Sequence, residues 1–262
     1  MKDPSLLKYI EYFLLDMDGT LYLGDKIFEG TIEFLKTIKS HNKKYLFLTN
    51  NSSRSTKEYC EKLNKMGISA IGEEIFTSGE ATIIYLKGLG EKNKIYLLGT
   101  PGLEKEFEEA GFILTENDPD YVVLGFDKTL TYQKLETACN LIQRGVRFIA
   151  THPDFVCPTE GLPIPDCGAM IKLITAATGK EPKVIGKPNT EMINSALTKL
   201  GAKPEETAII GDRYYTDMEM GFRAGLTTIL VLSGETKEKD IAKMHKNPDY
   251  IFNSVDDIIQ YI

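Results

Sequence analysis

The stretch Tyr12-Phe13-Leu14-Leu15-Asp16-Met17-Asp18-Gly19-Thr20 decides how the rest of the chain is interpreted. It begins with an apolar run, which is typical of a strand buried on both faces of a parallel sheet. The run ends in two aspartates that are one residue apart, and a glycine and a threonine follow them. Because ligands in open α/β sheets bind beyond the carboxyl ends of the strands, we expect these acids at a functional site.

Asp16 and Asp18 can address one site, since alternate residues of an extended strand share a face. Two carboxylates placed so close together repel each other, and they require a cation between them or a proton on one of them. The structural alternative is a polar strand end at which Asp-Gly simply opens a turn. The pair therefore predicts a site for chemistry, with a turn as the competing interpretation.

Length and charge limit the classes of protein that fit. The chain has 262 residues, 42% of them hydrophobic, which is enough for one large domain or two of ordinary size. The net charge is −7, the sequence pI is about 5.2 and no basic block occurs, which argues against a nucleic-acid polymer as partner. No apolar run approaches the ~20 residues that cross a bilayer, so we expect no membrane association.

The cysteines and the N-terminal residues indicate a compartment. Cys60, Cys139, Cys157 and Cys167 are widely spread and form no C-x-x-C pair, which predicts reduced thiols and no disulfide framework. The first residues show no pattern of a secretion signal. We therefore expect a cytoplasmic protein.

Strand-like runs alternate with amphipathic helical segments along almost the whole chain, which predicts a parallel α/β architecture. The expected strands are residues 12–15, 45–48, 75–77, 95–98, 121–124, 147–150, 183–185, 208–210, 228–232 and 250–252. A helix is expected over residues 217–224. Residues 151–168 form the longest irregular stretch and contain four prolines. Loops of this length are usually functional or mobile.

Three further polar clusters follow expected strands, namely Thr49-Asn50-Asn51, Gly186-Lys187-Pro188 and the segment 211–217. Taken separately each is weak, because a Thr-Asn pair is a common turn and cap and a lysine is usually a surface residue. Taken together with the first aspartates they supply the parts for phosphoryl transfer. A carboxylate can accept a phosphoryl group as an aspartyl phosphate. Mg²⁺ prefers oxygen ligands that include one or two carboxylates, which Asp16 and Asp212 could provide.

The remaining polar residues fit the same chemistry. Thr49 and Asn50 can hold phosphate oxygens with a hydroxyl and amide donors near a helix N-terminus. Lys187 can add a fixed positive charge for the phosphoryl oxygens in the transition state. Asp18 can protonate the departing alcohol and then deprotonate the attacking water.

This set of residues resembles the haloacid dehalogenase superfamily, and specifically its phosphatases. Asp16-Met17-Asp18-Gly19-Thr20 is similar to the first motif of the family, D-x-D-G-T, and Thr49 and Lys187 match the second and third motifs. The fourth motif, G-D-x-x-x-x-D, matches Asp212 and Asp217. The resemblance covers all four motifs in family order and implies a Rossmann-like parallel-sheet core.

The resemblance also implies roles for individual residues. Asp16 would be the nucleophile and Asp18 the general acid and base, with Thr49 and Lys187 completing the catalytic set. Mg²⁺ would be held by Asp16, the main-chain carbonyl of Asp18, and Asp212, with Asp217 in support. Phosphate would be bound by the four residues Thr49, Asn50, Asn51 and Lys187.

The spacing of the motifs predicts where a second domain is inserted. Only 28 residues separate Thr20 from Thr49, which is too few for a domain, whereas 135 separate Asn51 from Lys187. We therefore expect a catalytic core in residues 1–79 and 183–262, with an inserted α/β cap in residues 80–182. This arrangement is similar to the type-two capped branch that includes the NagD-like and 4-nitrophenylphosphatase-like enzymes.

The irregular stretch 151–168 is the candidate for the cap surface that faces the substrate. It contains His152, Asp154, Asp166 and Cys167, which we consider candidate specificity residues. The structural alternative is a connector that its prolines stiffen. The resemblance favours Asp166 and Cys167 slightly, because a Pro-x-x-Gly segment opens the last cap helix in this branch.

The sequence thus predicts a Mg²⁺-dependent phosphatase that hydrolyses small phosphate monoesters through an aspartyl phosphate. The substrate classes implied by the resemblance are sugar phosphates, nucleoside monophosphates and 4-nitrophenyl phosphate. One alternative is a phosphomutase, although its cap usually lies between the first two motifs. Another is a regulatory module with a phosphorylated aspartate, although such modules are about half this length. The sequence leaves open the physiological substrate, the formation of a homo-oligomer and the role of Arg213.

Overall fold

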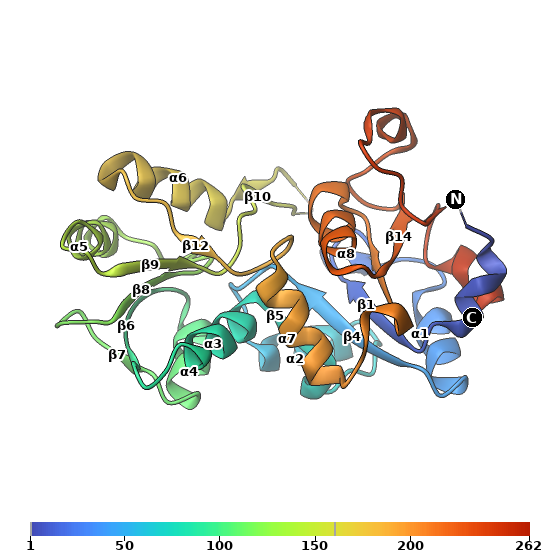
Figure 1. Ribbon diagram of the computed structural model, residues 1–262, viewed down its shortest axis with the longest axis horizontal. Helices are drawn as coiled ribbons and strands as arrows, with labels where there is room; N and C mark the ends of the chain where they lie inside the picture. The colour runs from blue at the N-terminus through green and yellow to red at the C-terminus, as the bar shows by residue number, and fades with distance from the viewer. Residues whose placement is uncertain (1, 160) are drawn as a thin grey trace. The chain divides into compact units, whose positions relative to one another are not determined.

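The computed structural model describes residues 2–159 and 161–262. Residues 1 and 160, which belong to the predicted core and cap segments, lie outside the described residues. The chain divides into two compact units. The first unit comprises Met1–Thr49, Cys60–Phe76 and Ile193–Ile262, and the second comprises Asn50–Tyr59 and Thr77–Met192. Each unit contains its own parallel sheet flanked by helices, which confirms the predicted fold class (Figure 1).

Among the described residues, the sheet of the first unit has six strands in the order β15-β14-β13-β1-β4-β5. Strand β1 lies between β13 and β4 and is parallel to both, with Leu14 opposite Ile209 and Leu46. A short hairpin of β2 and β3 follows β1. The strands of this unit are β1 (Tyr12–Asp16), β2 (Tyr22–Leu23), β3 (Lys26–Ile27), β4 (Lys44–Thr49), β5 (Ile75–Thr77), β13 (Thr207–Gly211), β14 (Thr227–Val231) and β15 (Tyr250–Phe252).

The helices associated with this sheet follow its strands in the chain. On α1, Phe34 packs edge-on against Phe13 of β1, with ring centroids 6.5 Å apart. The α-helices are α1 (Thr31–Ser40), α2 (Thr56–Lys65), α7 (Thr190–Leu200) and α8 (Glu219–Ala224). The shorter helical turns are η1 (Pro4–Tyr9), η2 (Gly72–Glu74), η3 (Pro204–Glu206), η4 (Tyr214–Met218), η5 (Glu238–Lys243) and η6 (Asp256–Tyr261).

The sheet of the second unit has five strands among the described residues, in the order β12-β9-β8-β6-β7, and all are parallel. Its strands are β6 (Lys94–Leu98), β7 (Ile113–Leu114), β8 (Tyr121–Leu124), β9 (Arg147–Ala150) and β12 (Lys183–Val184). The predicted boundary between cap and core falls immediately before β12. In the structure this strand pairs with β9, so that Lys183 and Val184 extend the second sheet.

Helices cover both faces of this second sheet. The helices are α3 (Ser78–Gly88), α4 (Pro101–Glu109), α5 (Tyr132–Gln143) and α6 (Cys167–Thr178). On one face, α5 and α6 lie beside each other, and α3 and α4 lie on the other (Figure 1). Leu141 of α5 and Ile171 of α6 belong to one buried cluster with Val122 of β8 and Phe148 of β9. The second unit is therefore a layered α/β structure with its own core.

The stretch 151–168 is more ordered than the sequence predicts. It contains a short antiparallel hairpin of β10 (Val156–Cys157) and β11 (Ile164–Pro165), and α6 begins at Cys167. Two-residue strands are too short for a period-two pattern, which is why the sequence showed only a loop. The helix predicted over residues 217–224 is present, but its first residues belong to a π-helical turn, η4, which begins at Tyr214 and leads into α8.

Two further expectations concern chemistry and membranes. The four cysteines are free thiols, as the sequence predicts. Across residues 2–159 and 161–262, no helix combines the length and hydrophobicity that a bilayer crossing requires.

Candidate active site

Three neighbouring strands of the first unit end in the polar residues that the sequence singled out. Asp16 ends β1, Thr49 ends β4 and Asp212 directly follows β13. Because these strands are adjacent and parallel, their carboxyl ends lie at one edge of the sheet. All three side chains are buried. The topology therefore places these three side chains at the same edge of the sheet.

Asp16, Asp212 and Asp217 form an acidic cluster. Each offers a carboxylate oxygen, and these oxygens lie within 4.8 Å of one another. Within the described part of the chain, this is the group found to be close enough to hold a metal ion. Asp217 was predicted only to support the metal site, but its carboxylate oxygen belongs to the same cluster as those of Asp16 and Asp212. The cluster could thus bind a divalent cation through oxygen atoms alone.

The hydroxyl of Thr20 joins two of these acids. Its Oγ1 lies 3.4 Å from Oδ2 of Asp16 and 3.3 Å from Oδ1 of Asp212. The side chain of Thr20 is fully buried. One hydroxyl proton can serve only one acceptor at a time. This hydroxyl can therefore donate to Asp16 or to Asp212, but not fully to both.

The loop after β14 holds Asp212 from a second side. The main-chain N–H of Glu235 donates to Oδ2 of Asp212 at 2.6 Å. A Cβ atom at Gly234 would lie 1.8 Å from the same oxygen, and one at Gly19, where φ is +92°, would lie 2.4 Å from it. Only glycine fits at these two positions, because the backbone passes directly against the carboxylate.

The π-helical turn positions Asp217. The main-chain N–H of Arg213 donates to Oδ2 of Asp217 at 3.1 Å, and a Cβ at Gly211 would lie 2.4 Å from Cγ of that aspartate. The Arg213 side chain pairs with Glu235, with Nε and Oε2 3.1 Å apart. This arginine therefore links the turn after β13 to the loop that holds Asp212.

Burial first, and then the charges of Asp16 and Asp217, together raise the pKa of Asp212 to about 8. Such a shift shows that the ionised form is unfavourable here without a counter-charge. A divalent cation would supply that charge, and hard cations prefer a donor set made only of oxygen. The residues present therefore fit a divalent metal.

Asp18 lies outside the acidic cluster, and its side chain is partly exposed. Two residues that the sequence analysis missed approach its carboxylate. The Nζ of Lys62, on α2, lies 4.0 Å from Oδ1, and the hydroxyl of Tyr22 lies 3.5 Å from Oδ2. The same Nζ lies 4.1 Å from the centroid of the Tyr22 ring. No motif marks this lysine, because only the packing of α2 brings it to the aspartate.

In the second unit, Lys187 is bound by the side chain of Asn50. Both residues are buried. Oδ1 of Asn50 accepts from the main-chain N–H of Lys187 at 2.8 Å, and Nδ2 donates to its carbonyl at 3.1 Å. Nδ2 also donates to Oδ1 of Asp154 at 3.1 Å. The predicted phosphate-binding residue Asn50 thus uses its amide within the protein.

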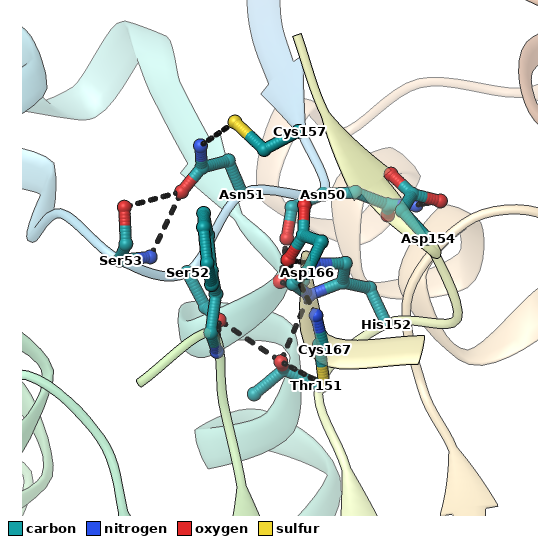
Figure 2. A network of polar contacts seen from close by, with 12 residues as sticks. Asn50, Asn51, Ser52, Ser53, Thr151, His152, Asp154, Cys157, Asp166 and Cys167 are labelled. Carbon is teal, nitrogen blue, oxygen red and sulfur yellow. Dashed lines mark hydrogen bonds and ion pairs between the residues drawn. The ribbon is translucent and has the colours of Figure 1, made fainter. Parts of the chain in front are cut away.

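The neighbouring Asn51 also has partners of its own. Its Oδ1 accepts from the main-chain N–H and hydroxyl of Ser53 at 2.9 and 2.8 Å, and Nδ2 lies 3.6 Å from Sγ of Cys157 (Figure 2). This arrangement fixes the start of the segment that leads into α2. Whether Asn50 and Asn51 bind phosphate stays a prediction.

The four candidate specificity residues of the cap are buried: His152, Asp154, Asp166 and Cys167. Nε2 of His152 lies 2.9 Å from Oδ1 of Asp166, and this oxygen also accepts from the main-chain N–H of Cys167 at 2.6 Å (Figure 2). Burial raises the pKa of the Cys167 thiol to about 12. These residues tie the loop after β9 to the start of α6. Their contact with a substrate stays a prediction.

Comparisons with known proteins agree with this geometry. Residues 13–113 match the family model of haloacid dehalogenase-like hydrolases, and residues 184–258 match a second, HAD-hydrolase-like model. A dihydroxyacetone phosphatase of Corynebacterium glutamicum is 39% identical over 94% of this chain and 90% of its own. The 5'-nucleotidase YutF of Bacillus subtilis is 36% identical over 98% of this chain and 100% of its own.

A solved structure shows the same overall fold. The 4-nitrophenylphosphatase of Thermotoga maritima superposes with a TM-score of 0.94 and 44% sequence identity. The match covers 97% of this chain and 98% of that one. The resemblance to the 4-nitrophenylphosphatase-like branch, predicted from four motifs, is thereby confirmed.

Proposed function

The chain belongs to the haloacid dehalogenase-like hydrolases and acts on phosphate monoesters, and from this we propose that it is a Mg²⁺-dependent phosphatase of small metabolites. The observation that carries the proposal is the buried acidic cluster of Asp16, Asp212 and Asp217 at the carboxyl edge of the first sheet. We take the substrates to be sugar phosphates, nucleoside monophosphates and, as a test compound, 4-nitrophenyl phosphate. The names of the similar proteins support these classes.

Asp16 is the proposed nucleophile. One of its carboxylate oxygens attacks the phosphorus atom, the bond between phosphorus and the ester oxygen breaks, and an aspartyl phosphate forms. Water then attacks the phosphorus, which releases inorganic phosphate and restores the carboxylate. The position of Asp16 at the end of the central strand, fixed by pairing on both sides, supports this role.

Asp18 is the proposed general acid and base. It gives a proton to the ester oxygen as the alcohol leaves, and it takes one from the water that attacks next. Its carboxylate is separate from the buried cluster and is partly exposed, which fits a group that must exchange protons with both substrate and water.

The proposed metal site comprises Asp16, Asp212 and the main-chain carbonyl of Asp18, with Asp217 in support. When bound, Mg²⁺ would neutralise the carboxylates and the anionic substrate and so reduce their repulsion. The raised pKa of Asp212 supports this assignment, since burial and two neighbouring carboxylates disfavour its ionised form, and a bound cation would favour that form. The loop at Gly234 and Glu235 holds Asp212 in place for that role.

Thr49 and Lys187 are the proposed ligands of the phosphoryl oxygens, through a hydroxyl and an ammonium group. Asn50 and Asn51 join them in the proposal through main-chain N–H groups, since their side-chain amides are engaged within the protein. The four free cysteines favour a reducing compartment, and we propose the cytoplasm.

Release of inorganic phosphate from a panel of monoesters tests the proposal. The panel contains a triose phosphate, a hexose phosphate, two nucleoside monophosphates and 4-nitrophenyl phosphate, each assayed with EDTA and with Mg²⁺. We expect Mg²⁺-dependent release from at least one physiological class. Protein that is inert toward every ester, or equally active in EDTA, contradicts it. Transfer of the phosphoryl group between two positions of a sugar, without release, would instead indicate a phosphomutase.

A further inference from the structure

Residues predicted to bind phosphate or to determine specificity form a buried polar network that includes the main chain of Lys187. Asn50 is at the centre of this network, and its amide contacts two groups of the lysine main chain and one carboxylate. Further hydrogen bonds extend from the loop after β9 to the first turn of α6 (Figure 2). Buried polar groups of this kind specify one arrangement when all of them are satisfied.

The orientation of the Asn50 amide follows from its partners. The N–H of Lys187 is a donor, so it must face the carbonyl oxygen Oδ1 of Asn50. The carbonyl of Lys187 and the carboxylate of Asp154 are acceptors, so both must face Nδ2. A flipped amide would place its N–H donors against the Lys187 N–H, and its oxygen against two other acceptors. The amide therefore binds Lys187 as a neighbouring strand would, with one accepted and one donated hydrogen bond.

The close fit around Gly186 supports this relationship. A Cβ atom there would lie 2.6 Å from Oδ1 of Asn50, 2.6 Å from the carbonyl oxygen of Thr151 and 2.9 Å from Cβ of His152. The N–H of Gly186 also donates to the carbonyl of Thr151 at 2.7 Å. The chain that carries Lys187 is thus held between Asn50 and the loop after β9.

Asp154 is itself held by α6. The N–H of Gly168 donates to the carbonyl of Asp154 at 2.7 Å, and a Cβ at Gly168 would lie 2.1 Å from the carbonyl oxygen of Pro153. Asp166 caps the same helix and pairs with His152 at 2.9 Å. The carboxylate that fixes the Asn50 amide is therefore anchored to a helix of the second sheet.

We propose that Asn50 and Asp154 are positioning residues that fix Lys187, and that they do not select the organic part of the substrate. This inference rests on the proposed function, in which Lys187 contacts the phosphoryl oxygens. Every phosphate monoester presents the same phosphoryl group, so a displaced lysine should lower kcat by the same factor for all esters. A residue that contacts the leaving group would instead change the ratio of activities between esters.

Asn50→Asp is the principal test variant. It keeps the shape and the acceptor for the Lys187 N–H, but it turns a second acceptor toward Asp154 and the Lys187 carbonyl. Misplacing a catalytic group by about 1 Å can cost about 10²-fold in rate. We expect a kcat loss of that order, equal within error for a sugar phosphate, a nucleoside monophosphate and 4-nitrophenyl phosphate, with smaller changes in KM.

The reciprocal change provides the rescue. In Asn50→Asp combined with Asp154→Asn, an amide at position 154 can again donate to the residue at position 50. We expect this double variant to recover part of the lost kcat, and Asp154→Asn alone to lose less than Asn50→Asp. A role in folding alone would change the melting temperature but leave the kcat of the folded protein unaltered. If Asn50→Asp does not fold, Asn50→Ala replaces it as the test variant, because it introduces no charge. The same equal loss of kcat on all esters is expected.

Asn140→Ala is the matched control, because this asparagine is exposed on α5 of the same unit. It should keep wild-type kinetics on every ester. Wild-type kcat in the folded Asn50 variants, or a loss confined to one ester class, would overturn the inference. Wild-type protein that is inert on all esters would instead refute the proposed function, so the two failures are distinguishable.

Discussion

The ammonium group of Lys62 lies over the face of the Tyr22 ring, 4.1 Å from its centroid. From there it approaches Oδ1 of Asp18 at 4.0 Å. A cation over an aromatic face is held electrostatically, and Tyr22 is fully buried beneath it. This arrangement gives the proposed general acid a fixed positive neighbour that belongs to no sequence motif.

Removing that neighbour should affect esters unequally. Protonation by Asp18 matters most for a poor leaving group such as an alkoxide, and least for 4-nitrophenolate, which leaves readily without a proton. We therefore expect Lys62→Met to lower kcat for a sugar phosphate about tenfold, a barrier increase of about 1.4 kcal/mol. The loss for 4-nitrophenyl phosphate should be smaller. Steady-state kinetics on both esters measure the difference.

Two variants serve as controls for this prediction. Lys62→Arg should restore most of the rate, because it keeps a cation over the ring. Lys65→Met, on the exposed side of the same helix, should behave like wild type. Equal losses on both esters would show that Lys62 does not act through the general acid.

The stability of the metal-free protein should depend on pH through Asp212. Its folded-state pKa is raised to about 8 from an ordinary value of 3.8, so the folded protein binds a proton that the unfolded chain has released. Its contribution to stability is therefore complete below about pH 4 and is lost as the pH rises through about 8. In EDTA, the free energy of unfolding should fall over this interval more steeply for wild type than for Asp212→Asn.

Mg²⁺ should remove this difference. A ligand that binds only the folded state stabilises it by mass action, and a cation competes with the proton on Asp212. Urea unfolding from about pH 5 to about pH 9, with and without Mg²⁺, makes the comparison. Two results would exclude this linkage. One is a free energy of unfolding that rises with pH for wild type relative to Asp212→Asn in EDTA. The other is a wild-type free energy of unfolding that Mg²⁺ does not change above pH 8.

Substitution at Gly234 should weaken the metal site without altering any ligand. A Cβ there would lie 1.8 Å from Oδ2 of Asp212, so Gly234→Ala must displace the carboxylate or the loop. We expect a higher Mg²⁺ concentration for half-maximal activity and a lower maximal rate. Gly88→Ala is the control, since a Cβ at that helical position meets no atom within 4 Å. An unchanged Mg²⁺ requirement in Gly234→Ala would contradict the account of the loop.

The strands and the acidic cluster could be predicted because each leaves a local pattern. Buried parallel strands such as β1 and β4 appear as apolar runs, and parallel neighbours bring their carboxyl ends together. Asp16 and Asp212 stand at the ends of such runs, so they lie at the same edge of the sheet once their strands are parallel neighbours. The two-residue strands β10 and β11 carry no detectable period.

The residues that the sequence analysis missed are brought to the site by packing alone. Lys62 lies on a helix face and Gly234 in a loop after β14, at spacings that the motifs do not specify. His152 and Asp154 are candidate specificity residues that the structure buries and hydrogen-bonds within the protein, and their contact with a substrate stays a prediction. Polar residues in a proline-rich stretch have the same sequence pattern whether they bind a ligand or each other.

The central claim is that Asp16 is the nucleophile, and the kcat/KM of Asp16→Asn tests it most directly. The amide preserves the shape of the side chain but removes the charge that attacks phosphorus. With saturating Mg²⁺ and the best ester of the panel, we predict a fall of several orders of magnitude. This fall should exceed the ~10²–10⁴-fold expected when acid–base help alone is lost, as in Asp18→Asn. Folded Asp16→Asn protein that turns over at a rate near wild type would contradict the mechanism.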